Sequence, residues 1–169
     1  KIICYVLVYL LSDLLINFYV LLSSSCTAQT GIYLSKRNPR CFMYVFAHNA
    51  EAGEHATISQ SIHGEDLPFV FGAPLGEVGP FGTQFSAEER LLSEAMMRYL
   101  SNFAKTGNPT VPWQHRFHNL NPVDWDRFDV DWQEFNEINQ NYLLVSTEPM
   151  VSQRYRHRYT KFWNEGLHD

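Results

Sequence analysis

The sequence predicts an α/β fold, because one chain carries both a well-marked buried strand and a well-marked amphipathic helix. The strand signal lies at 40–47, a short stretch rich in β-branched and aromatic residues that follows the turn-forming pair Asn38 and Pro39. The helix signal lies at 86–105, where apolar residues recur at helical spacing. A second strand signal at 142–145 and a final helical pattern follow, so strands and helices share one chain.

The helix at 86–105 is the best-specified element of the sequence. Ser86 and Glu89 have the spacing of a capping box, in which each side chain accepts a hydrogen bond from the other residue's backbone amide. The apolar positions that follow are Leu92, Ala95, Met96, Tyr99, Leu100 and Phe103. Lys105 suits the negative end of a helix, and Gly107 followed by Pro109 predicts where the helix stops.

The segments between these elements have the composition of loops. We expect a polar loop at 49–61, a short extended piece at 67–71, and a surface loop rich in glycine and proline at 72–85. The stretch 111–140 alternates aromatic with acidic residues. This pattern predicts a solvated connection that is pinned to the core by its aromatic side chains.

The last part of the chain is predicted to form an edge strand at 142–145 and then a helix that Pro149 opens. The apolar face of this helix is predicted to hold Val151, Tyr155, Tyr159, Phe162 and Trp163. The remainder of the helix is basic, which is typical of a solvated face.

Composition excludes several classes of function. The formal net charge of the 169 residues is −5 and no basic stripe interleaves with the aromatic residues, which excludes a nucleic-acid binder. The three cysteines, Cys4, Cys26 and Cys41, lack zinc-ligand spacing. His115 and His118 have no further ligand nearby, and the acidic residues after Asp124 do not follow an EF-hand. The sequence therefore predicts no metal and no cofactor.

The segment His-Gly-Glu-Asp-Leu-Pro-Phe-Val-Phe-Gly-Ala-Pro-Leu, which starts at His63, is the most informative motif. It resembles the segment that carries the catalytic histidine in type-B carboxylesterases, the cholinesterase-like branch of the α/β-hydrolases. Further blocks resemble that family in the same order: the strand at 41–48, the helix and its Thr-Gly-Asn-Pro stop at 86–109, and the last strand and helix at 141–164. The resemblance implies that 27–169 is the C-terminal part of an incomplete α/β-hydrolase domain.

The resemblance implies that His63 occupies the position of the triad histidine, which takes a proton from the nucleophilic serine. The family orders its triad as nucleophile, acid and histidine, and this chain contains no Gly-x-Ser-x-Gly. Glu65 and Asp66 are poor candidates for the acid, because the family's acid lies far upstream. We expect no ester hydrolysis by this chain alone. Both a working histidine and a vestigial one stay open, as does a Cys26–Cys41 disulfide.

Within the family, the motif looks most like invertebrate neuroligins and gliotactins, which keep the esterase fold without the nucleophile. This likeness implies a non-catalytic receptor outside the cell, at the plasma membrane, with a protein adhesion partner. It also implies a homodimer through the helix at 150–165. The alternatives are a secreted active carboxylesterase with His63 as its base, and a gene fragment without a folded product. A nucleophile elbow upstream in the parent gene would favour the enzyme.

Residues 1–26 form an atypical apolar segment. The chain begins at Lys1, and we expect it to be a fragment of a longer protein. A lysine, an apolar run and small residues before Cys26 imitate a signal peptide, while a membrane span would place Asp13 near the bilayer centre. A buried core element is the third interpretation. The run 16–26 also reads like a translated pyrimidine-rich tract, which favours a gene-model artefact.

Overall fold

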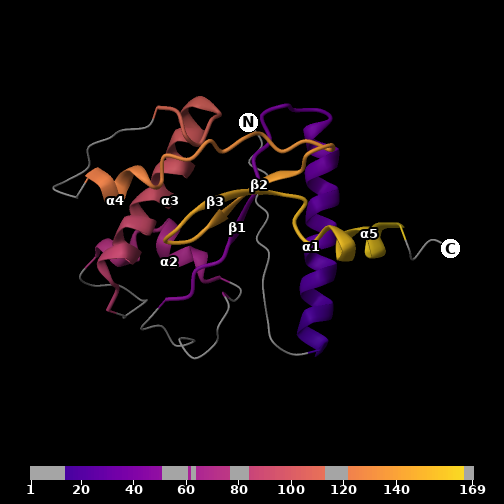
Figure 1. Cartoon of the computed structure of the whole chain (residues 1–169), viewed down its shortest axis with the longest axis horizontal. Coiled ribbons are helices and arrows are strands. Elements are labelled where there is room, and N and C mark those ends of the chain that lie inside the picture. The colour runs from indigo at the N-terminus through magenta and orange to yellow at the C-terminus, as the bar shows by residue number, and fades with distance from the viewer. Residues whose placement is uncertain (1–13, 51–60, 62–63, 77–83, 113–121, 166–169) are drawn as a thin grey trace.

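The computed structural model describes residues 14–50, 61, 64–76, 84–112 and 122–165. These residues form a small sheet with helices on both of its faces (Figure 1). In chain order the elements are helix α1 (Leu14–Ser35), strand β1 (Tyr44–Phe46), helix α2 (Asp66–Val70), the 3-10 turn η1 (Ala73–Leu75), helix α3 (Ala87–Thr106), helix α4 (Pro122–Asp126), strand β2 (Asn141–Val145), strand β3 (Met150–Gln153) and helix α5 (His157–Glu165). The expected mixed α/β fold is confirmed.

The sheet has the order β1-β2-β3, in which β1 runs parallel to β2 and β3 runs antiparallel to it. Leu143 lies at the centre, opposite Tyr44 on one side and Val151 on the other. Helices α2, α3 and α4 lie on one side of the sheet, and α1 and α5 lie on the other (Figure 1). This arrangement buries both faces of β1, as expected of a strand in a parallel pair.

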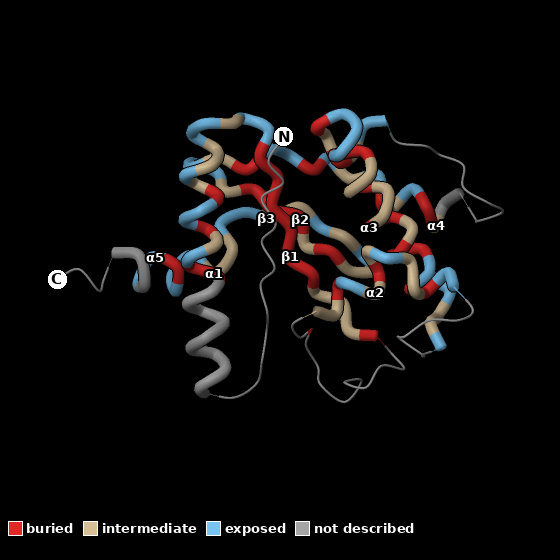
Figure 2. The backbone as a smooth tube through the Cα atoms, turned by 180° about the vertical axis from the view of Figure 1, so that it is seen from behind, coloured by how far each residue is buried: buried red, intermediate tan, exposed pale blue. Residues whose placement is uncertain are grey.

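Strand β1 sends alternate side chains into two separate apolar clusters. Tyr44 and Phe46 join the larger cluster under α3, whereas Val45 and Met43, the residue just before the strand, join the smaller cluster under α1. Val45 is fully buried, and Figure 2 shows this strand as one of the most buried segments of the fold. The predicted buried strand within 40–47 is confirmed. Each such side chain contributes about 1.5–3 kcal/mol by leaving water.

Helix α3 has the start, the stop and the buried face that the sequence predicts. The Ser86 amide donates to Glu89 Oε2 at 2.7 Å, and the Glu89 amide donates to Ser86 Oγ at 3.3 Å. Gly107 ends the helix in the left-handed region, with φ of 82°, and its amide donates to the Phe103 carbonyl. Of the predicted apolar positions, all except Leu100, which is half-buried, lie in the core.

The predictions for the end of the chain were wrong in two respects. Residues 142–145 do not form an edge strand, because β2 lies between β1 and β3. Residues 150–153 are strand β3 rather than the start of a helix, which begins at His157. Pro149 suits the entry to an edge strand as well as the first turn of a helix, so the sequence signal was ambiguous. Tyr155 precedes the helix and packs its ring on Tyr142, with centroids 5.3 Å apart.

The predicted extended piece at 67–71 was also wrong, because helix α2 covers most of it. Pro68 lies in the first turn of α2. Backbone amides of the first turn have no acceptor within the helix, so proline loses no hydrogen bond there. The Leu67 amide donates to the Gly64 carbonyl, and the Phe71 amide donates to the Leu67 carbonyl, both at 3.0 Å. The backbone hydrogen bonds on either side of Pro68 therefore form a helical turn that includes the proline.

The aromatic side chains of the connection before β2 are buried, as the sequence predicts; those within the described part are Trp125, Phe128, Trp132 and Phe135. Polar groups of two aromatics fix this connection to the core. Tyr99 Oη donates to the Phe128 carbonyl at 2.5 Å, and Trp132 Nε1 donates to the Met43 carbonyl at 3.1 Å. Trp113 lies outside the described residues.

Two questions about the N-terminal half concern the membrane and the cysteines. Within the described residues, no helix has the length and apolar character that a membrane span needs. Cys26 is exposed and Cys41 is buried, and neither is in a disulfide. The Cys26–Cys41 bridge is therefore absent from this structure. Cys4 and Asp13 lie outside the described residues.

Candidate functional site

The candidate site lies at the carboxyl end of β1, where the segment that leads to the motif leaves the sheet. The Ala47 amide donates to the Val145 carbonyl at 2.8 Å, which is the last backbone contact between this segment and β2. After the single described residue Ser61, the described structure resumes at Gly64, and the chain then enters α2. His63 lies outside the described residues. The geometry of the site is therefore defined by the residues on either side of that histidine.

His48 and Glu89 form the polar centre of this region. His48 Nε2 lies 2.9 Å from Glu89 Oε1, and the Glu89 side chain is fully buried while that of His48 is 12% exposed. The second carboxylate oxygen of Glu89 accepts the Ser86 amide. One carboxylate thus closes the start of α3 and binds the segment that follows β1. A buried carboxylate needs such partners, because leaving it unpaired is costly.

Aromatic rings enclose His48 on two sides. Its ring packs edge-on against Phe69, with centroids 5.3 Å apart, and against Phe46, at 6.4 Å. Phe69 in turn contacts Phe46 at 5.3 Å and Phe85 at 5.9 Å. These contacts fix the plane of the His48 ring.

The segment immediately after His63 is held by a second set of buried contacts. Gly64 adopts a φ of 90°, a conformation that favours glycine over residues with a side chain. Tyr44 Oη donates to Asp66 Oδ2 at 3.3 Å, and Asp66 is 4% exposed. Ser93 Oγ donates to the Phe69 carbonyl at 2.8 Å. Strand β1 and helix α3 therefore anchor the two ends of the loop that carries His63.

This arrangement gives a rigid frame rather than a complete reaction centre. The Asp66 carboxylate accepts a hydrogen bond from Tyr44, and its exclusion as a triad acid stays a prediction from the family resemblance. Across the described residues, no group of three or more His, Cys, Asp and Glu side chains gathers in a way that could hold a metal ion. His55, His115 and His118 lie outside those residues. The frame fixes the described segments on either side of position 63, through Glu89 at His48 and through Asp66 at Tyr44.

The sequence signature for the carboxylesterase family covers most of the chain, from residue 6 to residue 163. The chain belongs to the carboxylesterase family. The fold is accordingly a partial carboxylesterase-family domain, as the sequence resemblance predicted.

Curated members of this family that resemble the chain include neuroligins. Human Neuroligin-2 is 36% identical over 128 residues, which cover 73% of this chain and 15% of the relative. Neuroligin-3 of Macaca mulatta is 34% identical over 140 residues, which cover 76% of this chain and 67% of the relative. Human Neuroligin-3 has the same identity, with 16% of its length covered. The chain thus spans less than a fifth of the human neuroligins that it matches.

The carboxylesterase frame contains two residues whose roles the sequence did not reveal. The sequence assigned no role to His48, yet it binds a buried acid next to the motif. Glu89 was recognised as the capping residue of α3, but its burial and its second partner were not predicted. The only sequence signal that could have identified His48 was its position, two residues after the end of β1. The role of His63 stays a prediction from the family resemblance.

Proposed function

We propose that this chain is the C-terminal part of a non-catalytic adhesion receptor of the neuroligin type. The observation that carries the proposal is the identity of 34–36% to neuroligins over about three quarters of the chain. Under this proposal the domain lies on the extracellular face of the plasma membrane and binds a protein partner. The anchored frame around position 63 then serves the stability of the domain, and His63 is vestigial.

We further propose that α5 contributes to a homodimer in the parent protein. Tyr159 and Phe162 lie on one side of α5 and are 55% and 57% exposed. Thr160 is buried, and its carbonyl accepts a hydrogen bond from Ser25 Oγ of α1 at 3.4 Å. The helix therefore rests on α1 with one side and leaves an aromatic side open. Aromatic residues are enriched at the cores of interfaces, which supports a self-complementary contact here.

The second candidate function is an active carboxylesterase in which His63 is the general base. The motif around His63 favours it, and so does the frame that holds both ends of the loop. In that case a nucleophilic serine, a buried acid and the oxyanion donors would come from a part of the protein upstream of this chain.

One experiment on the full-length protein separates the two functions. Cells that express it at their surface are mixed with cells that display candidate surface proteins, and aggregation is scored. The same protein and its His63→Ala variant are assayed with p-nitrophenyl esters. Adhesion that survives His63→Ala, without ester turnover, is expected. Ester turnover that disappears with His63→Ala would instead support the active carboxylesterase and contradict the receptor proposal.

A further inference from the structure

The outer side of α2 and η1 carries large apolar side chains that meet solvent. Leu67 and Phe71 lie one helical turn apart, because the Phe71 amide donates to the Leu67 carbonyl at 3.0 Å. Both are exposed, as is Leu75 at the end of η1, and Phe71 is 75% exposed. On the opposite side of the same segment Phe69 is fully buried in the core. The segment is therefore apolar on both sides.

The composition of this segment is that of a buried element. Residues 67–76 read Leu-Pro-Phe-Val-Phe-Gly-Ala-Pro-Leu-Gly, without one charged or hydrogen-bonding side chain. A helix at the surface of a protein normally carries polar residues on its outer side, whereas a helix that is apolar all round is buried. Residues 67–76 thus have the sequence of a segment that is covered on both faces, and the described residues cover one of them.

Contacts with α3 fix which side of the segment faces outward. Both α2 and η1 pack on α3, and Ser93 Oγ of that helix donates to the Phe69 carbonyl at 2.8 Å. The approach is close, because a Cβ added at Gly72 would meet Met97 Sδ at 3.0 Å. A rotation of α2 that buried Phe71 would break these contacts and expose Phe69. Phe71 is therefore held on the outside.

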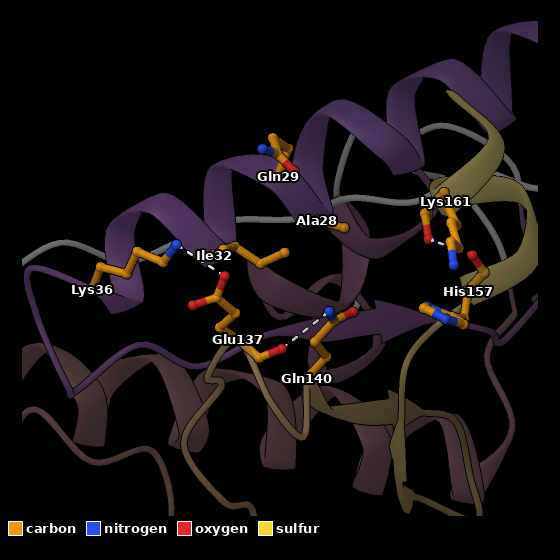
Figure 3. Close-up of a pocket in the computed structure, with 9 residues that line it drawn as sticks. Ala28, Gln29, Ile32, Lys36, Glu137, Gln140, His157 and Lys161 are labelled. Carbon is orange, nitrogen blue, oxygen red and sulfur yellow. Dashed lines mark hydrogen bonds and ion pairs between the residues drawn. The ribbon is translucent and has the colours of Figure 1, made fainter. Parts of the chain in front are cut away.

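An exposed apolar residue in the turn before β2 has a different setting. Figure 3 shows this turn beside α1, where Lys36 Nζ binds Glu137 Oε1 at 2.9 Å and Gln140 Nε2 donates to the Glu137 carbonyl at 3.3 Å. Ile138 of the turn is 75% exposed, like Phe71, but it stands between Glu137 and Asn139. Single exposed apolar residues of this kind are ordinary, whereas an apolar run marks a contact surface.

We propose that the outer face of α2 and η1, formed by Leu67, Phe71 and Leu75, packs permanently against the upstream part of the same carboxylesterase-family domain. The chain belongs to that family, yet the matched residues make up 15% of human Neuroligin-2, so most of the length of such a relative lies outside the match. The upstream surface is apolar where it meets this face, because no side chain of 67–76 could pair with a buried charge.

The chemistry of the face disfavours other occupants. Permanent interfaces resemble the core of a domain, whereas the interface with a separable partner is about as polar as the rest of a surface. A membrane surface would be matched by basic residues, and 67–76 contains none. The homodimer contact proposed for α5 lies on the other side of the sheet (Figure 1). The inference rests on the premise of both candidate functions that the chain belongs to a longer protein, and it depends on neither adhesion nor ester turnover.

Site-specific photo-crosslinking in the full-length protein identifies what covers the face. Phe71→p-benzoylphenylalanine places an aromatic group there that couples to a neighbouring C–H bond under ultraviolet light, and mass spectrometry locates the coupled residue. The expected product is a crosslink to a residue upstream of this chain in the same polypeptide. Ile138→p-benzoylphenylalanine is the matched control, because Ile138 is equally exposed in this structure, and it is expected to give no upstream crosslink.

Hydroxyl-radical footprinting of the wild-type full-length protein needs no substitution, and it decides alone if the photo-reactive variant gives no crosslink. After correction for the intrinsic reactivity of each residue type, Phe71 is expected to be oxidised as slowly as the buried Phe69, and Ile138 much faster. Oxidation of Phe71 as fast as that of Ile138 would overturn the proposal. So would a crosslink from position 71 to a second copy, to a separate protein, or only to residues of this chain. Failure of the adhesion assay would leave both measurements unchanged.

Discussion

His48 Nε2 lies 2.9 Å from Glu89 Oε1, so one buried carboxylate joins the end of β1 to the start of α3. The same side chain accepts the Ser86 amide through its other oxygen. The segment that leads to the family motif begins at this point, and the motif continues through Gly64 into α2, where Asp66 accepts a hydrogen bond from Tyr44. The position of the motif therefore depends on two buried hydrogen-bonded groups outside it, the Glu89 carboxylate and the Tyr44 hydroxyl.

Glu89→Ala is expected to lower the free energy of unfolding by roughly 3 kcal/mol, because it removes a buried carboxylate that accepts from two half-buried groups, the His48 ring and the Ser86 amide. Ser86→Ala removes only the reciprocal cap and should cost about 1 kcal/mol. Urea unfolding of both variants measures the difference. Equal costs would mean that Glu89 acts as a cap alone. In a double-mutant cycle, His48→Ala and Glu89→Ala should be non-additive, because the two residues share one contact.

Gly64→Ala is expected to destabilise the fold by about 1–2 kcal/mol, because φ of 90° is unfavourable for any residue with a Cβ. Steric clash does not contribute to this cost, since the nearest atom to an added Cβ is Leu67 Cδ1 at 3.8 Å. Gly31→Ala is the matched contrast: its added Cβ would meet the Phe135 ring at 3.0 Å without a positive φ. Thermal unfolding compares the two. A neutral Gly64→Ala would show that the backbone can relax there.

The double variant Tyr159→Glu and Phe162→Glu is expected to give a folded monomer of the parent ectodomain. Both side chains are more than half exposed, so charged replacements should disrupt the proposed dimer interface without disturbing the core. Light scattering measures the oligomeric state, and circular dichroism checks the fold. Lys161→Glu, on the opposite side of α5, should leave the dimer intact. A dimer that persists in the double variant would place the interface elsewhere.

The parts of the fold that the sequence predicted are those with local signals. The capping box, the stop at Gly107 and the buried stretch at β1 each follow from a few neighbouring residues. The errors fall where a proline was ambiguous: Pro68 lies inside a helix that was read as extended, and Pro149 precedes a strand that was read as a helix. The second case is decided by the antiparallel pairing of 150–153 with β2, which the proline alone does not report.

The candidate site could be located from the sequence but not constructed from it. The motif placed His63 at the end of a loop by family resemblance, and the structure adds the frame on either side of it. The contact between His48 and Glu89 joins residues 41 positions apart, and no periodic pattern reports such a pair. The same holds for α1 and α5, which are remote in the chain but are joined by the hydrogen bond from Ser25 Oγ to the Thr160 carbonyl.

Tyr99→Phe tests the fold through its pH dependence. Burial, with a further contribution from the negative charge of Asp129, raises the pKa of Tyr99 far above its ordinary value of 10.0. The phenol therefore stays protonated in the folded protein at a pH where the unfolded chain loses that proton. Its contribution to stability is complete below pH 10.0 and declines as the pH rises further, because the unfolded state then binds fewer protons.

At neutral pH, Tyr99→Phe should be less stable than the wild type by about 1 kcal/mol, because it lacks the hydrogen bond to the Phe128 carbonyl. This gap should narrow above pH 10.0, since only the wild type loses stability through Tyr99. Urea unfolding at about pH 8 and at about pH 10.5, which lie below and above the ordinary tyrosine pKa, measures this difference in stability. Leu100→Ala is the control, because it removes no titrating group and its deficit should stay constant. If the deficit of Tyr99→Phe were equally constant, the Tyr99 phenol would ionise as readily in the folded protein as in the unfolded chain.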